Sequence, residues 1–244
     1  MSDLLQQISV ITKTGSALVI NKPAGLIVHS DGRTDEPNVC DWILANYPDT
    51  AGVGEPIERE DKKDIPRPGI VHRLDRETSG VLIIARTKEA YEHIKQHFKN
   101  REIKKEYDAF VYGEITDHHF TIDEPIGRSS GDDFRKYSVP PYVRGETREA
   151  RTDFVVNTAT DTATHLTAYP KTGRTHQIRV HLKSIHHPVV CDSLYASGKE
   201  CFWGLDRQAL HARRITFNLP SGETISAEAG LPADLRRARE QINP

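Results

Sequence analysis

The feature that most constrains this chain is an uninterrupted apolar run, Val81-Leu82-Ile83-Ile84-Ala85, which follows Ser79-Gly80 directly. A strand with one face in water needs polar residues at alternate positions, and this run has none. It is also far shorter than the roughly 20 residues of a membrane-spanning helix. We therefore expect a strand buried on both faces, in a chain whose 36% hydrophobic content suffices for a full core.

A helix is expected directly after this strand. Thr87 can cap its N-terminus, Glu89 lies in the positive first turn, and Ala90, Tyr91, Ile94 and Phe98 form one apolar stripe. Further strands are predicted from β-branched and aromatic patterns, and a turn is expected at 220–222. These predicted strands are 17–20, 26–29, 107–113, 164–169, 215–219 and 224–227. Strands should outnumber helices in a mixed α/β domain.

Two stretches lack apolar periodicity. Residues 47–68 contain four prolines and a charged run from Glu58 to Asp64, which predicts a long mobile loop. Residues 127–145 are rich in Gly, Ser, Asp, Arg and Pro, which indicates an insertion or loop beside the site that the flanking strands build.

Charge and cysteine usage exclude several classes of protein. The formal net charge of −2 argues against a general polyanion binder, although residues 171–183 hold four basic side chains and no acid. This local patch suits phosphate contacts, or is simply a solvated basic face. Cys40, Cys191 and Cys201 are odd in number and widely spaced, so we expect reduced cysteines, with neither a disulfide framework nor a zinc site.

The segment His72-Arg73-Leu74-Asp75-Arg76-Glu77-Thr78-Ser79-Gly80 places a carboxylate among basic residues just before the buried strand. Catalytic groups are often mounted at such an edge between rigid scaffold and solvent. The same residue types are also ordinary turn formers, so the residue types alone favour Asp75 as a surface salt-bridge or turn residue.

The second polar segment runs from Lys171 to Leu182, and Gly173 marks a turn in it. If its later half is helical, Arg179 lies near one face with Ile178 and can point inward toward a carboxylate. His176 and His181 suggest a metal, but no HExxH pattern or companion cysteine pair accompanies them, so no metal site is predicted. Glycine-rich nucleotide motifs are also absent, and we expect no cofactor.

Lys104-Lys105-Glu106-Tyr107 enters a predicted strand and combines cations with an aromatic ring. That combination suits phosphate contact together with base stacking. The alternative is a tyrosine on a half-buried strand with no further role.

Taken together, four segments resemble, in order and spacing, the successive motifs of the RluA-type RNA pseudouridine synthases. They are Asn21-Lys22-Pro23-Ala24-Gly25-Leu26, residues 72–80, Lys105-Glu106-Tyr107 and residues 172–181. The resemblance covers about residues 10–236 and implies a single catalytic domain, residues 1–244, with the pseudouridine synthase fold. That fold has a central, mostly antiparallel mixed sheet with flanking helices and loops around an RNA-binding cleft.

The resemblance also implies roles for individual residues. Asp75 matches the catalytic aspartate, Tyr107 the tyrosine that stacks on the target base, and Arg179 the arginine that pairs with the aspartate, with Arg174 as a rival for that pairing. Arg73 matches an arginine that enters the RNA stack as uridine flips out. The remaining residues expected to contact substrate are His72, Lys105, His176, Gln177 and Ile178.

The implied reaction breaks the C1′–N1 bond of a uridine, turns the uracil and rejoins it through C5, without metal or cofactor. A carboxylate suits this reaction because it can attack C1′ covalently or take a proton from the sugar. The implied partner is ribosomal or transfer RNA. We expect the protein to act on it as a monomer in the cytoplasm, with no membrane association. The alternatives are a non-catalytic RNA-binding protein on the same fold, and a metal-dependent hydrolase that uses the histidines.

Two departures from the family pattern bear on substrate choice. Only about 20 residues precede the Asn21 motif, so we expect the N-terminal S4-like RNA-binding module of many relatives to be missing. Where relatives usually have His-Pro-x-x-Gly-Asp, this chain has His187-Pro188-Val189-Val190-Cys191-Asp192, and Ser129-Ser130-Gly131 replaces a stretch that is often more basic.

Overall fold

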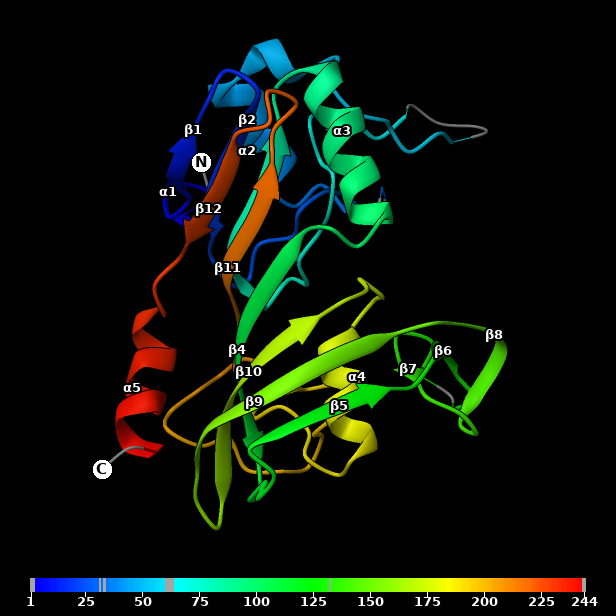
Figure 1. The fold of residues 1–244 in the computed structure, drawn as a ribbon, viewed down its shortest axis with the longest axis vertical. Coiled ribbons are helices and arrows are strands. Elements are labelled where there is room, and N and C mark those ends of the chain that lie inside the picture. Colours follow the sequence, from blue (N-terminus) through cyan, green and yellow to red (C-terminus); the bar gives the residue numbers. More distant parts are fainter. Residues whose placement is uncertain (1–2, 31, 33, 60–63, 132, 243–244) are drawn as a thin grey trace. The chain divides into compact units, whose positions relative to one another are not determined.

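The computed structural model describes residues 3–30, 32, 34–59, 64–131 and 133–242. The chain divides into two compact units, one formed by Met1–Lys104 with Ala212–Gly230 and the other by Lys105–His211 with Leu231–Pro244. Strands outnumber helices in the described residues, and the mixed α/β class predicted from the sequence is confirmed (Figure 1).

The sheet of the first unit contains the double-sided strand predicted from the apolar run. Every residue of β3 is buried, and β2 pairs with it antiparallel, with Val19 opposite Ile83. Strand neighbours follow the order β1-β2-β3-β11, and β12 pairs with β11 after a turn closed by Gly222 N–H and Leu219 O. The bounds are β1 Ser9–Lys13, β2 Ala17–Lys22, β3 Ser79–Ala85, β11 Leu210–Asn218 and β12 Thr224–Glu228.

The helix after β3 begins as predicted. In α3 (Lys88–Lys99), the Thr87 side chain accepts the N–H of Ala90 at 3.1 Å, and the buried stripe contains Tyr91 and Ile94. The other helices of this unit are α1 (Asp3–Gln6), α2 (Val39–Asn46) and the short 3-10 helix η1 (Pro48–Thr50).

One predicted strand of the first unit is wrong. Residues 26–29 form only an isolated bridge, between Ile27 and Asn38, because the carbonyl oxygens of Ile27 and Val28 accept the N–H groups of Val39 and Cys40 at the start of α2. The predicted loop at 47–68 is irregular apart from η1 and a bridge between Ile57 and Ile65. Residues 60–63 of its charged run lie outside the described residues.

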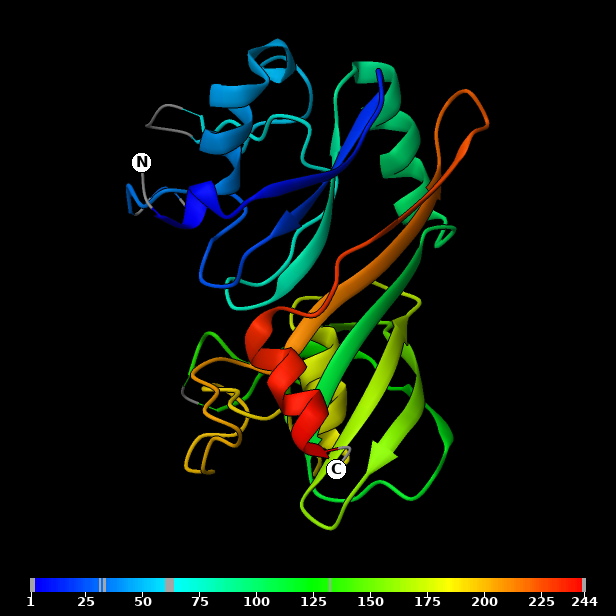
Figure 2. The same ribbon diagram turned by 90° about the vertical axis from the view of Figure 1, so that its left-hand side faces the viewer.

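The second unit has its own antiparallel strands in the order β4-β10-β9-β5. Helices α4 and α5 pack against β10, and Figure 2 shows α5 alongside these strands. The core combines Phe110 and Leu166 of the sheet with Leu182 of α4 and Leu235 of α5. The bounds are β4 Lys104–Tyr112, β5 His119–Asp123, β9 Arg151–Ala159, β10 Ala163–Pro170, α4 Gln177–Ser184 and α5 Ala233–Ile242.

The stretch expected to be an insertion or loop, residues 127–145, contains most of a small sheet. Its strands, in the order β7-β6-β8, are β6 (Ile126–Ser129), β7 (Tyr137–Ser138) and β8 (Val143–Arg148). Only the loop alternative is wrong; the strands could not be predicted because they are short and separated by Gly, Ser and Pro, so no apolar alternation develops. Residue 132 lies outside the described residues.

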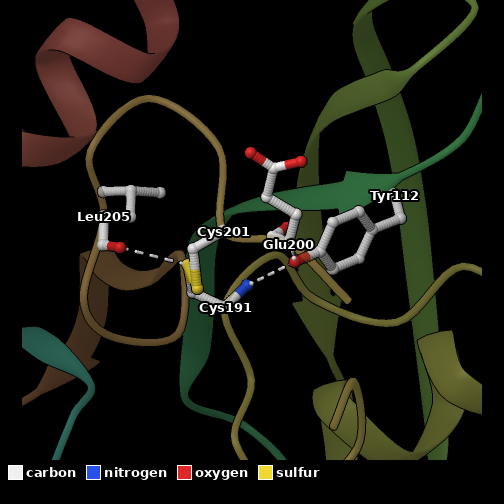
Figure 3. The surroundings of a disulfide bond; sticks show 5 residues. All are labelled: Tyr112, Cys191, Glu200, Cys201 and Leu205. Atoms are coloured by element: carbon white, nitrogen blue, oxygen red, sulfur yellow. Dashed lines mark hydrogen bonds between the residues drawn. A yellow bond between two sulfur atoms is a disulfide. The ribbon is translucent and has the colours of Figure 1, made fainter. Parts of the chain in front are cut away.

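The expectation of reduced cysteines is wrong for two of the three. Cys191 and Cys201 form a disulfide with their Cα atoms 4.9 Å apart (Figure 3). Cys40 is free and buried. The Tyr112 hydroxyl accepts the Cys191 N–H and donates to Glu200 O, which fixes both arms of the loop. Tertiary contacts of this kind bring the two sulfur atoms together, and they cannot be predicted from the spacing of the cysteines in the sequence.

Candidate functional site

Asp75 lies on the short loop that leads into β3. It is half-buried between the buried Leu74 and an exposed Arg76, and its carbonyl oxygen accepts the N–H of Thr78 at 3.1 Å. Every residue of β3, which begins four residues after Asp75, is buried. The polar loop that carries Asp75 is therefore anchored to a rigid strand.

Lys22 fixes the backbone of this loop. Its side chain is fully buried, and its ammonium donates to Pro23 O at 2.8 Å, Leu26 O at 2.8 Å and Arg76 O at 3.0 Å. Gly25 N–H donates to the same Arg76 carbonyl at 3.0 Å. A buried cation needs such acceptors, and here they tie two loops together beside Asp75. No separate role of Lys22 could be predicted from the sequence.

Gly80 is required by close packing at the start of β3. Its φ is 117°, and a Cβ there would lie 2.1 Å from the carbonyl oxygen of Ala212 on β11. No side chain fits this approach, which explains the glycine after Thr78-Ser79.

The basic residues around Asp75 have different surroundings. His72 Nε2 accepts the N–H of Ile83 at 2.9 Å, and its ring packs on Phe98 at 4.8 Å, so this histidine braces the loop against β3 and α3. Arg73 is exposed, with Nη1 3.4 Å from His29 Nε2.

Arg76 forms a two-pronged pair with Glu36 at 2.5 and 2.7 Å. The hydrogen bonds from Arg76 and Thr34 lower the pKa of Glu36 to about 2. Glu36 therefore stays ionised, and this exposed pair links the Asp75 loop to the segment before α2.

In the second unit, Arg179 is buried on α4 and pairs with Asp192. Its Nε and Nη2 donate to the two carboxylate oxygens at 2.6 and 2.8 Å, and Asp192 also accepts the N–H groups of Leu194 and Tyr195. The guanidinium carbon lies 5.1 Å from the Tyr195 ring centroid. Asp192 and Tyr195 thus hold Arg179 in one orientation, an arrangement that was not predicted from the sequence.

The loop before α4 is organised by Gln177. Its side-chain oxygen accepts Thr172 Oγ1–H at 2.6 Å and Arg174 N–H at 3.0 Å. Its amide nitrogen donates to Arg151 O and Thr152 Oγ1, both at 3.0 Å. All these bonds serve the loop and its neighbouring strand β9, so Gln177 shapes the backbone that carries Arg174.

The two histidines of this segment are used in hydrogen bonds. His176, at φ 57°, places Nδ1 2.9 Å from the Tyr195 hydroxyl. His181 is buried, and Nε2 donates to Glu124 O while Nδ1 accepts from Thr152 Oγ1. Burial lowers the pKa of His181, which keeps it neutral. Among the described residues, no three His, Cys, Asp or Glu side chains gather as metal ligands.

Tyr107 and Lys105 lie on β4. Tyr107 is half-buried and packs against the core cluster that includes Ile178. Lys105 Nζ donates to Thr172 O at 2.9 Å, and burial, followed by the positive charge of Lys171, lowers the pKa of Lys105 to about 8. The predicted residues thus fall into two groups, with His72, Arg73 and Asp75 in the first unit and the others in the second.

Comparison with known proteins identifies the family. The family model for RNA pseudouridylate synthase matches residues 16–184. The chain belongs to the RNA pseudouridylate synthase family. An uncharacterised RNA pseudouridine synthase of Synechocystis sp. is 36% identical over 94% of this chain and 67% of its own length. Ribosomal large subunit pseudouridine synthase D of Xanthomonas campestris is 34% identical over 94% of this chain and 68% of its own length.

Solved structures agree on the fold of this pseudouridine synthase. Human RNA pseudouridylate synthase domain containing 1 superposes with a TM-score of 0.75 at 24% identity, covering 95% of this chain and 86% of its own. The family model and the relatives confirm that the RluA-type motifs reflect membership of the RNA pseudouridine synthase family. The enzyme isomerises uridine to pseudouridine in RNA. The helices in the described ranges are too short or too polar to cross a bilayer.

Proposed function

We propose that this pseudouridine synthase modifies ribosomal RNA with Asp75 as its catalytic carboxylate. The observation that carries the proposal is the support of the Asp75 loop, which the buried Lys22 ammonium ties down through Arg76 O. A catalytic group must be held in one geometry, and this loop joins a fully buried strand. Ribosomal RNA is favoured over transfer RNA because relatives such as that of Yersinia pestis are named ribosomal large subunit pseudouridine synthase D.

In the proposed reaction, Asp75 attacks C1′ or removes a proton from the sugar, and the C1′–N1 bond breaks with its electron pair on N1. Uracil then turns and C5 bonds to C1′, which breaks the bond between Asp75 and C1′ or, on the other route, is accompanied by return of the proton to the sugar. C5 loses its proton and N1 gains one, so the product is an isomer of the substrate. Tyr107 is the proposed stacking platform for the target base. Arg73, exposed beside the catalytic residue, is the proposed wedge that replaces the flipped uridine in the RNA stack.

Arg179 is the proposed cationic partner that keeps the catalytic carboxylate ionised. It is preferred to Arg174 because it is buried and held by Asp192, whereas Arg174 is half-buried and donates through Nε to Glu149 O. A guanidinium carries five N–H donors, so the pair with Asp192 does not exhaust it. His72, Lys105, His176, Gln177 and Ile178 complete the proposed substrate-binding set of one catalytic domain, and the enzyme acts as a cytoplasmic monomer.

The test is Asp75→Asn, with Asp117→Asn as an exposed control of the same chemistry. Each variant is incubated with unmodified ribosomal or transfer RNA transcripts, and pseudouridine is mapped by chemical modification and primer extension. Asparagine keeps the shape but cannot act as an anion, so the chemical step should fall by many orders of magnitude while RNA affinity changes little. Near-parental turnover by folded Asp75→Asn contradicts the assignment, and a parent that binds RNA without turnover favours the non-catalytic alternative.

Arg179 is tested in the same assay. Arg179→Ala should lower turnover, because the catalytic carboxylate loses its cation and its pKa rises. The double variant with Asp75→Asn should be no slower than Asp75→Asn alone, since both changes act on one step. Additive losses of turnover in the double variant contradict this shared role.

A further inference from the structure

A cavity of about 340 Å³ lies within the second unit, between the small sheet and the loop before α4. Its lining includes Arg128 of β6, Tyr137 of β7, Glu146 and Arg148 of β8, and Arg174. Strand β7 contacts α4, and Figure 1 shows β6, β7 and β8 gathered beyond one end of β5.

We propose that this cavity binds one nucleotide of the RNA substrate, distinct from the target uridine, and selects a base that carries an amino group. The inference rests on the proposed action on RNA and adds to it a site that reads sequence. Its evidence comes from the charges, the aromatic rings and the hydrogen bonds around the cavity.

Three guanidinium groups line the cavity. Arg128 Nη1 donates to Phe134 O at 2.8 Å, and Arg174 Nε donates to Glu149 O at 2.9 Å. Neither Arg128 nor Arg148 forms an ion pair with a carboxylate of the described residues. Glu146 is the one acidic residue among the residues that line the cavity, so the lining carries a net positive charge, which favours an anion, and an arginine fork suits a phosphate group.

Aromatic rings accompany these cations. The Arg128 guanidinium lies 4.5 Å from the Tyr137 ring centroid. Phe134 and Tyr142 do not line the cavity, but they lie on the connections between the same small strands and are 63% and 68% exposed. Unstacked RNA bases pack on aromatic rings and on guanidinium planes, so this combination indicates a single-stranded nucleotide and not a lone phosphate.

Glu146 decides which nucleotide fits best. Glu146 is an exposed residue of the same lining, where an acidic side chain opposes a bare phosphate. An ionised carboxylate only accepts hydrogen bonds, and amino groups on cytosine, adenine and guanine supply the donor. Uracil has no amino group, so the cavity should disfavour the base type that the active site converts.

A chain of contacts joins the cavity to Arg179. Tyr137 N–H donates to the Tyr195 hydroxyl at 3.0 Å, and that hydroxyl lies 2.9 Å from His176 Nδ1. The Tyr195 ring in turn lies against the Arg179 guanidinium. A nucleotide held by Tyr137 is therefore positioned on the same framework of contacts as Arg179 within the second unit.

The test compares Arg148→Ala with Arg144→Ala, which removes an exposed arginine from the same strand outside the cavity. With an unmodified large-subunit ribosomal RNA transcript, Arg148→Ala should raise Kd about tenfold and reduce the slope of log K against log salt by about 1. Arg144→Ala should stay within about twofold of the parent, since it loses only a general surface charge. Both sites are exposed, so the variants should fold.

Base selection is tested with the 5′-monophosphates of cytidine, adenosine, guanosine and uridine, titrated by NMR. The parent should bind uridine 5′-monophosphate with the lowest affinity of the four. Glu146→Gln should reduce the difference in affinity between that nucleotide and the other three, because a neutral amide also donates hydrogen bonds. Equal losses in the two arginine variants, or no preference among nucleotides, overturn the inference. These results are separate from the Asp75→Asn assay: an active parent with an unaffected Arg148→Ala variant refutes the cavity alone.

Discussion

Lys22→Met should strongly destabilise the first unit and disable the Asp75 loop. Methionine keeps the buried stem but removes three charge-assisted hydrogen bonds, to Pro23 O, Leu26 O and Arg76 O. Each such bond contributes about 1.5–3 kcal/mol. Relief of the buried ammonium's desolvation offsets part of that sum, so we expect the free energy of unfolding to fall by about 3–5 kcal/mol.

The assay is urea unfolding followed by tryptophan fluorescence. The chain has two tryptophans, so a Trp203→Phe background leaves Trp42, on α2 of the first unit, as the reporter. Lys88→Met, at an exposed lysine that begins α3, is the matched control and should change stability by less than about 0.5 kcal/mol. If the free energy of unfolding of Lys22→Met lies within about 1 kcal/mol of that of Lys88→Met, the buried ammonium does not hold the loop. Turnover should fall in Lys22→Met while RNA affinity persists.

Three further changes test other parts of the structure. Gly80→Ala should cost about 3–5 kcal/mol in urea unfolding because its Cβ meets Ala212 O, whereas Gly15→Ala, with open space around it, should be nearly neutral. His181 has a pKa lowered from 6.5, so the unfolded chain binds its proton first and stability is lost as pH falls below about 6.5; His181→Gln should flatten the dependence of Tm on pH between 5 and 7, and an unchanged slope contradicts this. Cys201→Ser should lower stability by about 2–3 kcal/mol through loss of a cross-link spanning 10 residues, and dithiothreitol should then have no further effect on Tm.

Local patterns were sufficient for the regular elements with strong hydrophobic signals. The apolar run at Val81 predicted β3, the Thr87 cap and its stripe predicted α3, and alternation predicted β4 and β10. In each case the same residues that carry the pattern are those that pack, so local preference and tertiary structure agree.

Features that depend on distant partners escaped prediction. Lys22 reads as an ordinary surface lysine until the Arg76 carbonyl, far along the chain, is placed against it. Cys191 and Cys201 meet because Tyr112 bridges their loop. The resemblance supplied roles for Asp75 and Arg179, but the motifs alone did not reveal that Asp192 and Tyr195 fix the arginine.

The division of the first unit into two chain segments has a consequence for synthesis. On a ribosome that adds about 5–20 residues per second, β11 emerges on the order of ten seconds after β3, its neighbour in the sheet. During that interval the edge of β3 that pairs with β11 has unpaired backbone N–H and C=O groups. An exposed edge of such an apolar strand is prone to aggregate or to bind chaperones. The folding of the nascent enzyme, and its yield in a crowded cell, should therefore depend on protection of β3 until β11 arrives.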